Sequence, residues 1–488
     1  MTNLLLFSRS KLIEEEENPS MKLSRRDLLK FAGISAAAAA VSGCTAAAGA
    51  APSAKGSTAS GKLLGKHQVV IIGGGWGGLT VAKELKKIDP KFDVAIIEKN
   101  DSFMSCPFSN CNLGGIEGVN LNVLTHDYAQ AIEKNGYGML HAEVTGIDRE
   151  AKVVHTTKGG VGYDILVLAP GIDYNYKGQF PAWSDAKIAK AKRVAPAALI
   201  PGGEHIALDR LVKNMEGGDV VITVPAGKYR CPPAPFERAS MIANYMQNEG
   251  IEGKVIILNE TAAIAKGAAF KEAWAEVNKG NVEHRDNCKI VDVDFDKKEI
   301  TYVQTVFKDK DDTEGVKTTH TIKYGIFNLI PHNMSNPVIE MAGVATTPDG
   351  FKKVKMASTP EKPVSFQTAT DKNVFAVGDV VGHAIPPSGQ SAIWSGKECA
   401  KEIAHILHGK SYSVASALPY KSANVCYSMV NGNPEEAIMV NHEFMVSGPV
   451  IGSKGSVPKD EKTGKFRTSG LAKATRDWYK GAMRDLFN

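Results

Sequence analysis

Short runs of apolar, β-branched residues alternate with helical segments along the chain from about residue 66. Two such runs, Gln68–Ile72 and Asp93–Ile97, flank a segment of helical character that extends from Leu79 to Lys87. Continuous apolar runs of this length are typical of strands buried on both faces of a parallel sheet. The order strand, helix, strand predicts a βαβ unit at the start of the folded part of the chain.

A second unit of the same kind follows farther along. Strand Gly218–Val224, helix Arg238–Asn248 and strand Lys254–Leu258 repeat this order. Two further strands are predicted at Tyr163–Leu168 and within Thr370–Asp379, and each leads into a turn that contains glycine. Together these elements predict an α/β protein with two Rossmann-like dinucleotide-binding domains and a C-terminal α+β domain.

A glycine-rich turn directly follows the first strand and fits the GxGxxG pattern with Gly73, Gly75 and Gly78. Gly73 allows the tight turn, Gly75 lets the backbone approach a pyrophosphate, and Gly78 lets helix and strand pack closely. The helix N-terminus offers free N–H groups to the phosphates. Glu98, 20 positions after Gly78, is placed to accept a hydrogen bond from a ribose 2′-OH. The complete set predicts a dinucleotide site.

The turns after two distant strands indicate that this dinucleotide is FAD. In flavoproteins with two dinucleotide domains, a turn such as that at Gly171 passes the chain to the second domain. A turn such as that at Gly378 brings the next residue, here Asp379, to the ribityl chain and the flavin phosphate. We therefore predict an FAD-binding domain built from residues 66–175 and 345–415.

The second unit has lost the glycines that would hold a nicotinamide dinucleotide. Residues 225–238 follow its first strand and contain four prolines and Cys231. Proline offers no N–H to a phosphate. We predict a degenerate NAD-type domain at residues 176–344, with a solvated hairpin tip at 308–312 and no bound nicotinamide dinucleotide. Residues 416–488 are expected to form a C-terminal interface domain.

The N-terminal region is typical of a bacterial export signal. Arg25 and Arg26 precede the short apolar stretch Phe31–Val41, which predicts a twin-arginine signal and a periplasmic protein. The signal, residues 1–44, ends in Val41–Cys44, a segment that resembles a lipobox, so lipidation of Cys44 is one expectation and simple cleavage is the other. Residues 45–65 are rich in small residues and are expected to be a flexible linker.

Composition narrows the partners that the chain is expected to have. The net charge of +5, from 58 basic and 53 acidic residues among 488, is too small to argue for nucleic acid. No run of 18 apolar residues predicts a transmembrane helix. None of the seven cysteines forms a CxxC pair, and we predict no metal site. Cys288 and Cys399 are expected to be structural.

Several short motifs after residue 66 point to one family of flavoproteins. They are the glycine turn at 73–78, Cys106–Asn110 followed by Gly114-Gly115, Arg230–Pro233, Gly378-Asp379, Pro387–Ala392, Asn424–Ser428 and Asp477–Tyr479. From about Lys66 to its C-terminus, the chain resembles the flavoprotein subunit of flavocytochrome c sulfide dehydrogenase, a relative of the sulfide:quinone oxidoreductases. The two motifs around Cys231 and Cys426 are more specific than the nucleotide fingerprint, which many families share.

This resemblance implies an FAD-dependent oxidoreductase that converts hydrosulfide to sulfur or polysulfide. In the family, a cysteine matching Cys106 binds FAD covalently, and cysteines matching Cys231 and Cys426 form a redox-active disulfide beside the flavin. Hydrosulfide opens such a bridge by thiol–disulfide exchange, which yields a persulfide and a thiolate. Electrons then pass to a c-type cytochrome subunit. The chain has no CxxCH motif, so it carries no c-type haem itself.

Three other functions stay open at this stage. A membrane-associated sulfide:quinone oxidoreductase needs an apolar C-terminal helical pair, which residues 466–488 match poorly because they are rich in charge. A flavin disulfide reductase would use a Cys106–Cys111 dithiol, against which the missing NAD(P)H fingerprint stands. A flavin-bearing sulfur-binding subunit would not catalyse a reaction. For electron exit to a cytochrome subunit, the C-terminal domain with Trp478 and Tyr479 is the expected platform against the flavin or the partner.

The charged groups near the cysteines allow more than one role. Arg230 would favour a thiolate and attract hydrosulfide if its side chain points inward, whereas the alternative is a surface salt bridge. The candidate proton carriers are His383, His332 and Glu237, although a single histidine is more often structural.

Overall fold

The computed structural model describes residues 62–309 and 311–488. The predicted export signal at 1–44, with Cys44, and residues 45–61 of the expected linker lie outside the described residues. Strand β1, Leu63–Ile72, begins inside the segment expected as linker, because Leu63 and Gly65 pair with strand β8, Gly159–Leu168. Apart from that edge, each strand predicted for the first βαβ unit is present.

The first and largest sheet has the order β5-β2-β1-β8-β7-β6, with β18 also paired to β8. Strands β1, β2, β5, β8 and β18 run parallel, and β6 and β7 add an antiparallel edge. The remaining bounds are Val94–Glu98 for β2, Gly138–His141 for β5, Val144–Asp148 for β6, Val153–Thr156 for β7 and Val374–Ala376 for β18. Strand β18 is contributed from late in the sequence, so this sheet joins two distant segments of chain.

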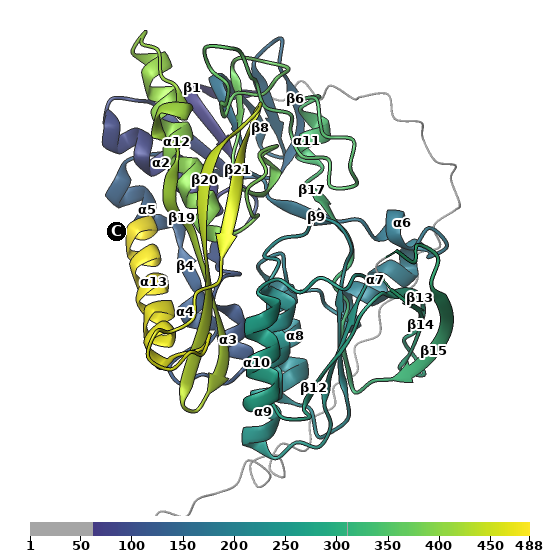
Figure 1. The fold of residues 1–488 in the computed structure, drawn as a ribbon. Coiled ribbons are helices and arrows are strands. Elements are labelled where there is room, and N and C mark those ends of the chain that lie inside the picture. Colours follow the sequence, from purple (N-terminus) through teal and green to yellow (C-terminus); the bar gives the residue numbers. More distant parts are fainter. Residues whose placement is uncertain (1–61, 310) are drawn as a thin grey trace, which may run out of the picture. The chain divides into compact units, whose positions relative to one another are not determined.

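Two helices cover this sheet near the glycine turn. Helix α2, Trp76–Ile88, starts within the turn, and helix α12, Gly389–Leu407, lies along it (Figure 1). A Cβ on Gly396 of α12 would lie 2.9 Å from the Thr80 Cβ of α2, so a small residue allows the close approach. The Ser388 side chain accepts a hydrogen bond from Ser391 N and caps α12. Helix α2 is longer than the predicted Leu79–Lys87 because the prediction omitted Gly77 and Gly78.

The segment between β3 and β8 supplies one wall of the later site. It holds a two-stranded ribbon and three short helices. Their bounds are Ser102–Met104 for β3, Ser109–Leu113 for α3, Leu121–Leu124 for α4, Thr125–Asp127 for β4 and Tyr128–Asn135 for α5.

The second sheet is parallel throughout, with the order β12-β11-β10-β16. Its strands span Val282–Arg285, Val255–Asn259, Val220–Val224 and Ile326–Asn328 in that order. Helix α9, Ala234–Glu249, begins four residues before the predicted Arg238. The helix includes prolines at its start: Pro233 is the N-cap and Pro235 lies in the first turn, where no intrahelical N–H is required.

Smaller elements complete this part of the chain. An antiparallel sheet joins β13, β14 and β15, and its β14–β15 hairpin contains the tip predicted at 308–312. The bounds are Cys288–Asp294, Glu299–Val306 and Val316–Lys323 for these strands, Ile172–Tyr174 for β9 and Asn333–Ser335 for β17, which pair with each other. The helices are Tyr176–Gln179 (α6), Asp185–Val194 (α7), Gly203–Lys213 (α8), Gly267–Glu276 (α10) and Val338–Met341 (α11).

The C-terminal part combines a three-stranded antiparallel sheet with one long helix. Strands β19, Tyr420–Gly432, β20, Glu435–Ser447, and β21, Val450–Ser456, precede helix α13, Ser469–Phe487. The apolar face of α13 is covered by protein, since Tyr479, Met483 and Phe487 are buried in the core of the FAD-type domain. Across residues 62–309 and 311–488, no helix has the length and apolarity needed to cross a membrane. The predicted fold class is confirmed.

Candidate active site

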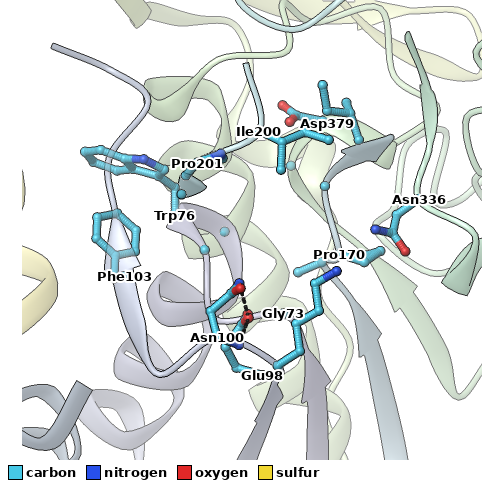
Figure 2. A pocket seen from close by; sticks show the side chains of 18 of the residues that line it. Gly73, Trp76, Glu98, Asn100, Phe103, Pro170, Ile200, Pro201, Asn336 and Asp379 are labelled. Atoms are coloured by element: carbon cyan, nitrogen blue, oxygen red, sulfur yellow. Dashed lines mark hydrogen bonds between the residues drawn. The ribbon is translucent and has the colours of Figure 1, made fainter. Parts of the chain in front are cut away.

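A cavity of about 770 Å³ opens at the carboxyl ends of the first sheet's parallel strands. This volume lies within the ~300–1,000 Å³ that is usual for small-molecule and cofactor sites. Seven of the eight predicted cofactor residues line it, namely Gly73, Gly75, Glu98, Cys106, Gly171, Gly378 and Asp379. Figure 2 shows Gly73, Glu98 and Asp379 around this space, with Trp76 and Phe103 on one side.

The three fingerprint glycines have three different surroundings. Gly73 has φ +106°, and a Cβ there would lie 2.3 Å from the Ala169 carbonyl oxygen. A Cβ on Gly78 would lie 1.9 Å from the Gly73 oxygen, so Gly78 serves the packing of strand and helix and does not line the cavity. A Cβ on Gly75 would meet nothing within 4 Å. The open space beside Gly75, at the start of α2, fits a pyrophosphate.

Glu98 is buried at the end of β2 and holds the glycine turn. Its Oε2 accepts a hydrogen bond from Gly74 N at 2.6 Å. Its Oε1 accepts bonds from Asn100 N at 2.8 Å and Asn100 Nδ2 at 2.6 Å, the contact drawn in Figure 2. The carboxylate therefore faces the cavity in a fixed orientation, as recognition of a ribose requires.

Arg230 and Asp379 form an ion pair in the cavity wall. The Asp379 carboxylate accepts hydrogen bonds from Arg230 Nε and Nη2, each at 2.6 Å, and Arg230 Nη1 donates to the Leu199 carbonyl at 2.9 Å. Asp379 is 6% exposed, so this pair is not the surface salt bridge considered from the sequence. Arg230 lines the cavity, as the inward-pointing alternative expected, and its charge is balanced by Asp379. The ion pair joins the two dinucleotide-type domains beside the predicted flavin position.

The loop between β3 and α3 carries Cys106 into the cavity. Burial raises the pKa of the Cys106 thiol, whereas the guanidinium groups of Arg230 and Arg238 act to lower it. The loop turns sharply at Phe108, which has φ +74°, a conformation that non-glycine residues adopt only when neighbouring contacts hold it. Cys106 is 8% exposed and lines the cavity, as a covalent flavin link would require.

Cys231 lies where the second dinucleotide unit would have its phosphate loop. It has φ +51°, and its N–H donates to the Pro387 carbonyl at 2.8 Å. Burial raises the pKa of its thiol well above the ordinary value, and the neighbouring thiols of Cys426 and Cys106 raise it further. Cys231 therefore interacts with both of the other predicted cysteines, and it lines the cavity.

Cys426 lies in β19 and is half-buried, but it does not line the cavity. Burial raises the pKa of its thiol, and the charge of Lys266 together with a hydrogen bond from it opposes that shift. The six described cysteines are all present as free thiols. The tertiary structure thus brings Cys106, Cys231 and Cys426 into one site, with Cys231 on the flavin side and Cys426 on the far side.

Two charged groups, the half-buried Glu237 and the buried Lys266, lie beside these thiols. The Glu237 carboxylate accepts hydrogen bonds from Asn110 Nδ2 at 3.0 Å and Met429 N at 2.8 Å, and burial raises its pKa. Lys266, which the sequence reasoning missed, donates from Nζ to the Cys426 carbonyl at 2.7 Å. The only signal in the sequence is that Lys266 precedes Gly267 at the start of a helix, which does not distinguish it from other lysines.

The other candidate residues lie away from this centre. The His332 ring pairs with Glu260 at 2.6 Å and does not line the cavity. The buried His383 ring contacts the Ser365 carbonyl at 3.1 Å and accepts from Ile451 N, which is a structural arrangement. Cys111 packs with Met241 and Met429 in a separate apolar cluster. Cys288 and Cys399 are fully buried.

Residues from the second domain also line the cavity, and the sequence reasoning did not identify them. They are the loop Ile200–Gly203 and the segment Asn336–Met341. A Cβ on Gly202 or Gly203 would meet nothing within 4 Å, so this loop leaves open space for a bound group. The cavity is therefore built at the junction of both domains, and its residues fit FAD.

Comparisons with known proteins agree with this geometry. A family model described as "Sulfide dehydrogenase (flavocytochrome c) flavoprotein chain, central" matches residues 206–319, and one described as "Pyridine nucleotide-disulphide oxidoreductase" matches residues 67–255. Among solved structures, the sulfide:quinone oxidoreductase of Aquifex aeolicus superposes with a TM-score of 0.64 at 18% identity, covering 86% of this chain and 92% of that one. This likeness shows the fold.

Two curated relatives were compared by sequence. The mitochondrial sulfide:quinone oxidoreductase of Dictyostelium discoideum is 25% identical over 329 residues, which cover 65% of this chain and 66% of that protein, just under two thirds of its length. The flavoprotein chain of sulfide dehydrogenase (flavocytochrome c) from Chlorobaculum thiosulfatiphilum is 48% identical over 46 residues, covering 9% of this chain and 96% of that sequence. The chain therefore belongs to the family of flavocytochrome c sulfide dehydrogenase flavoprotein chains, which is related to the sulfide:quinone oxidoreductases.

Proposed function

We propose that the chain is the FAD-carrying subunit of a periplasmic sulfide dehydrogenase, which oxidises hydrosulfide through a Cys231–Cys426 disulfide. The observation that carries this proposal is the position of Cys231, which lines the flavin cavity and interacts electrostatically with Cys426 and Cys106. Cys231 lines the flavin cavity, and Cys426 lies in the part-exposed strand β19. A pair of cysteines in these positions is suited to passing two electrons from a sulfur substrate to the flavin.

The chemistry of the first step follows from the arrangement of the two cysteines. Hydrosulfide attacks Cys426 Sγ, a new S–S bond forms there, and the Cys231–Cys426 bond breaks. The bonding pair leaves with Cys231 as a thiolate, while the proton stays on the terminal sulfur of the Cys426 persulfide. The negative charge thus moves from the substrate to the thiol that lines the cavity. FAD bound in that cavity supplies the two-electron acceptor.

Three finer features belong to the same proposal. Cys106, which lines the cavity, would hold FAD through a thioether. A c-type cytochrome subunit would take the electrons, in line with the family's flavocytochrome character. The twin-arginine motif at Arg25-Arg26 would direct the protein to the periplasm, with Cys44 as a lipid anchor. The relatives named as quinone oxidoreductases make a quinone the competing acceptor.

The decisive experiment is anaerobic addition of sulfide to the purified protein, with flavin bleaching as the measurement. Cys231→Ala and Cys426→Ala are expected to slow bleaching at least tenfold, because each removes the bridge. Cys399→Ala, which removes a buried thiol of α12 that does not line the cavity, is the matched control and should bleach at the wild-type rate. If both bridge variants also bleach at that rate, the disulfide mechanism is wrong. Re-oxidation by cytochrome c or by a soluble quinone then identifies the acceptor.

A further inference from the structure

Lys266 carries a buried positive charge in direct contact with the residue that holds the second thiol. It is 8% exposed, and its Nζ donates to the Cys426 carbonyl at 2.7 Å and to Ser428 Oγ at 2.9 Å. An ammonium group has three N–H donors. These two neutral acceptors use two of them, and the hydrogen bond that lowers the pKa of the Cys426 thiol uses the third, so the ammonium group is aimed at the reactive sulfur.

No carboxylate balances this charge at ion-pair distance in the described part of the chain. The ion pairs among residues 62–309 and 311–488 do not include Lys266. Glu237 acts on both thiols and interacts electrostatically with Lys266, but its two oxygens accept hydrogen bonds from Asn110 Nδ2 and Met429 N. A buried charge is costly unless a counter-ion accompanies it. The charge of Lys266 acts on Glu237 without an ion pair at contact distance, so an anion at Cys426 would be the negative group in direct contact with the ammonium.

The backbone at Lys266 is held in an unusual conformation. Lys266 has φ +59° and is the N-cap of α10, a position where its side chain satisfies no helix N–H. Non-glycine residues keep this conformation only when surrounding contacts impose it, and such residues gather at functional sites. Cys231, on the other side of the thiol pair, also has positive φ. Both ends of the site are thus positioned by strained backbone.

We propose that Lys266 forms the binding site for the sulfur anion at Cys426, holding hydrosulfide for attack. This inference rests on the proposed function, because it assumes that the anion reacts with Cys426. Ser428, fully buried, fixes the ammonium group toward β19, while Val425, Cys426 and Tyr427 are half-buried and leave that stretch of strand accessible to a small solute. The charge lies near both thiols, so it also stabilises the Cys231 thiolate when the negative charge moves there.

The test compares three substitutions in the full-length protein. Lys266→Met keeps the length of the side chain and removes its charge, Lys266→Arg keeps the charge, and Lys271→Met removes an exposed lysine from the same helix. A charge-assisted hydrogen bond has a net value that corresponds to about a 10- to 100-fold change in rate. Sulfide-dependent flavin bleaching should slow by that factor in Lys266→Met, by less than about threefold in Lys266→Arg, and not at all in Lys271→Met.

A second measurement does not depend on sulfide oxidation. In the reduced protein, Cys426 is alkylated with anionic iodoacetate or with neutral iodoacetamide, and the modified peptide is quantified by mass spectrometry. The iodoacetate-to-iodoacetamide ratio at Cys426 should fall about tenfold in Lys266→Met, because only the anionic probe is attracted by the lysine. A purely structural role would lower both rates together. An unchanged ratio overturns the inference.

These experiments distinguish a failure of the proposed disulfide mechanism from a failure of the Lys266 anion site. If Cys231→Ala and Cys426→Ala bleach at the wild-type rate but the alkylation ratio still depends on Lys266, the proposed function is wrong and the anion site stands. If those variants lose bleaching while Lys266→Met keeps both rate and ratio, the anion site is wrong. Should Lys266→Met not yield folded protein, the wild type decides: its ratio at Cys426 must exceed that of glutathione, and an equal or lower ratio contradicts the site.

Discussion

The indole ring of Trp478 stacks on that of Trp76, with ring centroids 5.8 Å apart and planes 15° from parallel. Trp76 is the first residue of α2 and lines the flavin cavity, whereas Trp478 belongs to the C-terminal helix α13. Trp478 Nε1 donates to Gln390 Oε1 of α12 at 2.7 Å. The last helix of the chain therefore supports the wall of the cofactor cavity from behind.

This contact predicts energetic coupling between the two ends of the folded chain. A double-mutant cycle with Trp76→Leu and Trp478→Leu should give a coupling of about 0.5–1.5 kcal/mol, the usual value for an aromatic pair beyond its buried area. The measurement is the free energy of unfolding in urea for the four proteins. Purely additive losses would show that the stacked rings do not support each other.

The Arg230–Asp379 pair predicts a loss that a second substitution restores. Arg230→Met leaves the buried Asp379 carboxylate without its guanidinium, which typically costs about 3–5 kcal/mol. Adding Asp379→Asn removes the uncompensated charge, so the double variant should recover most of the stability. Urea unfolding and the flavin-to-protein ratio of all three variants check this. Equal destabilisation of the single and double variants would contradict the pairing.

The glycine turn predicts opposite effects for two alanine substitutions. Gly78→Ala places a methyl group 1.9 Å from the Gly73 oxygen, so the strand and helix must separate and the protein should lose stability by roughly 1–3 kcal/mol. Gly75→Ala places its methyl in open space and should leave stability almost unchanged, while lowering the flavin-to-protein ratio after purification. Loss of stability in Gly75→Ala with normal flavin content would show that the cavity beside it does not hold the cofactor's phosphates.

His383 predicts a specific loss of stability in acid. Burial lowers its pKa to about 3, whereas an unfolded histidine titrates near ~6.5. The unfolded chain therefore takes up the proton first, so the stability from the neutral ring is complete above pH 6.5 and is lost as pH falls toward 3. At one proton and ~1.36 kcal/mol per pH unit, the loss between pH 7 and pH 5 is about 2 kcal/mol.

The comparison that checks this is His383→Gln, which keeps a donor for the Ser365 carbonyl and cannot titrate. Its stability difference from the wild type should shift in its favour by about 2 kcal/mol between pH 7 and pH 5. Urea unfolding at the two pH values measures the shift. Parallel pH profiles for the two proteins would mean that the folded ring takes up its proton as readily as the ring in the unfolded chain.

Cys106 predicts the fate of the flavin on acid precipitation. With a thioether to Cys106, yellow colour stays in the pellet, and Cys106→Ala releases it to the supernatant. Cys111→Ala is the matched control, because Cys111 is buried five positions away but packs in a separate cluster. Yellow colour in the wild-type supernatant would exclude the covalent link. Release of the colour by Cys111→Ala but not by Cys106→Ala would show that Cys111 carries the link.

Local sequence pattern predicted most of the first βαβ unit because its signals are contained within about 30 neighbouring residues. The predicted start of α9 at Arg238 was four residues late, because the first turn of a helix tolerates proline and Pro233 and Pro235 lie at the N-cap and in that turn. Lys266 was missed because its importance depends on Cys426, which is 160 residues away in the sequence.

By itself, the amino-acid sequence determined the α/β class, the dinucleotide turn at Gly73–Gly78 and the loss of the second fingerprint around Cys231, since each depends on residue type and short spacing. Only the tertiary structure decided that Arg230 pairs with Asp379 in the cavity wall, that Cys231 lies on the flavin side of Cys426, and that Lys266 contacts Cys426. The physical reason is that these contacts join segments from different sheets. Their distances and burial are set by how the sheets and helices pack, which no local pattern encodes.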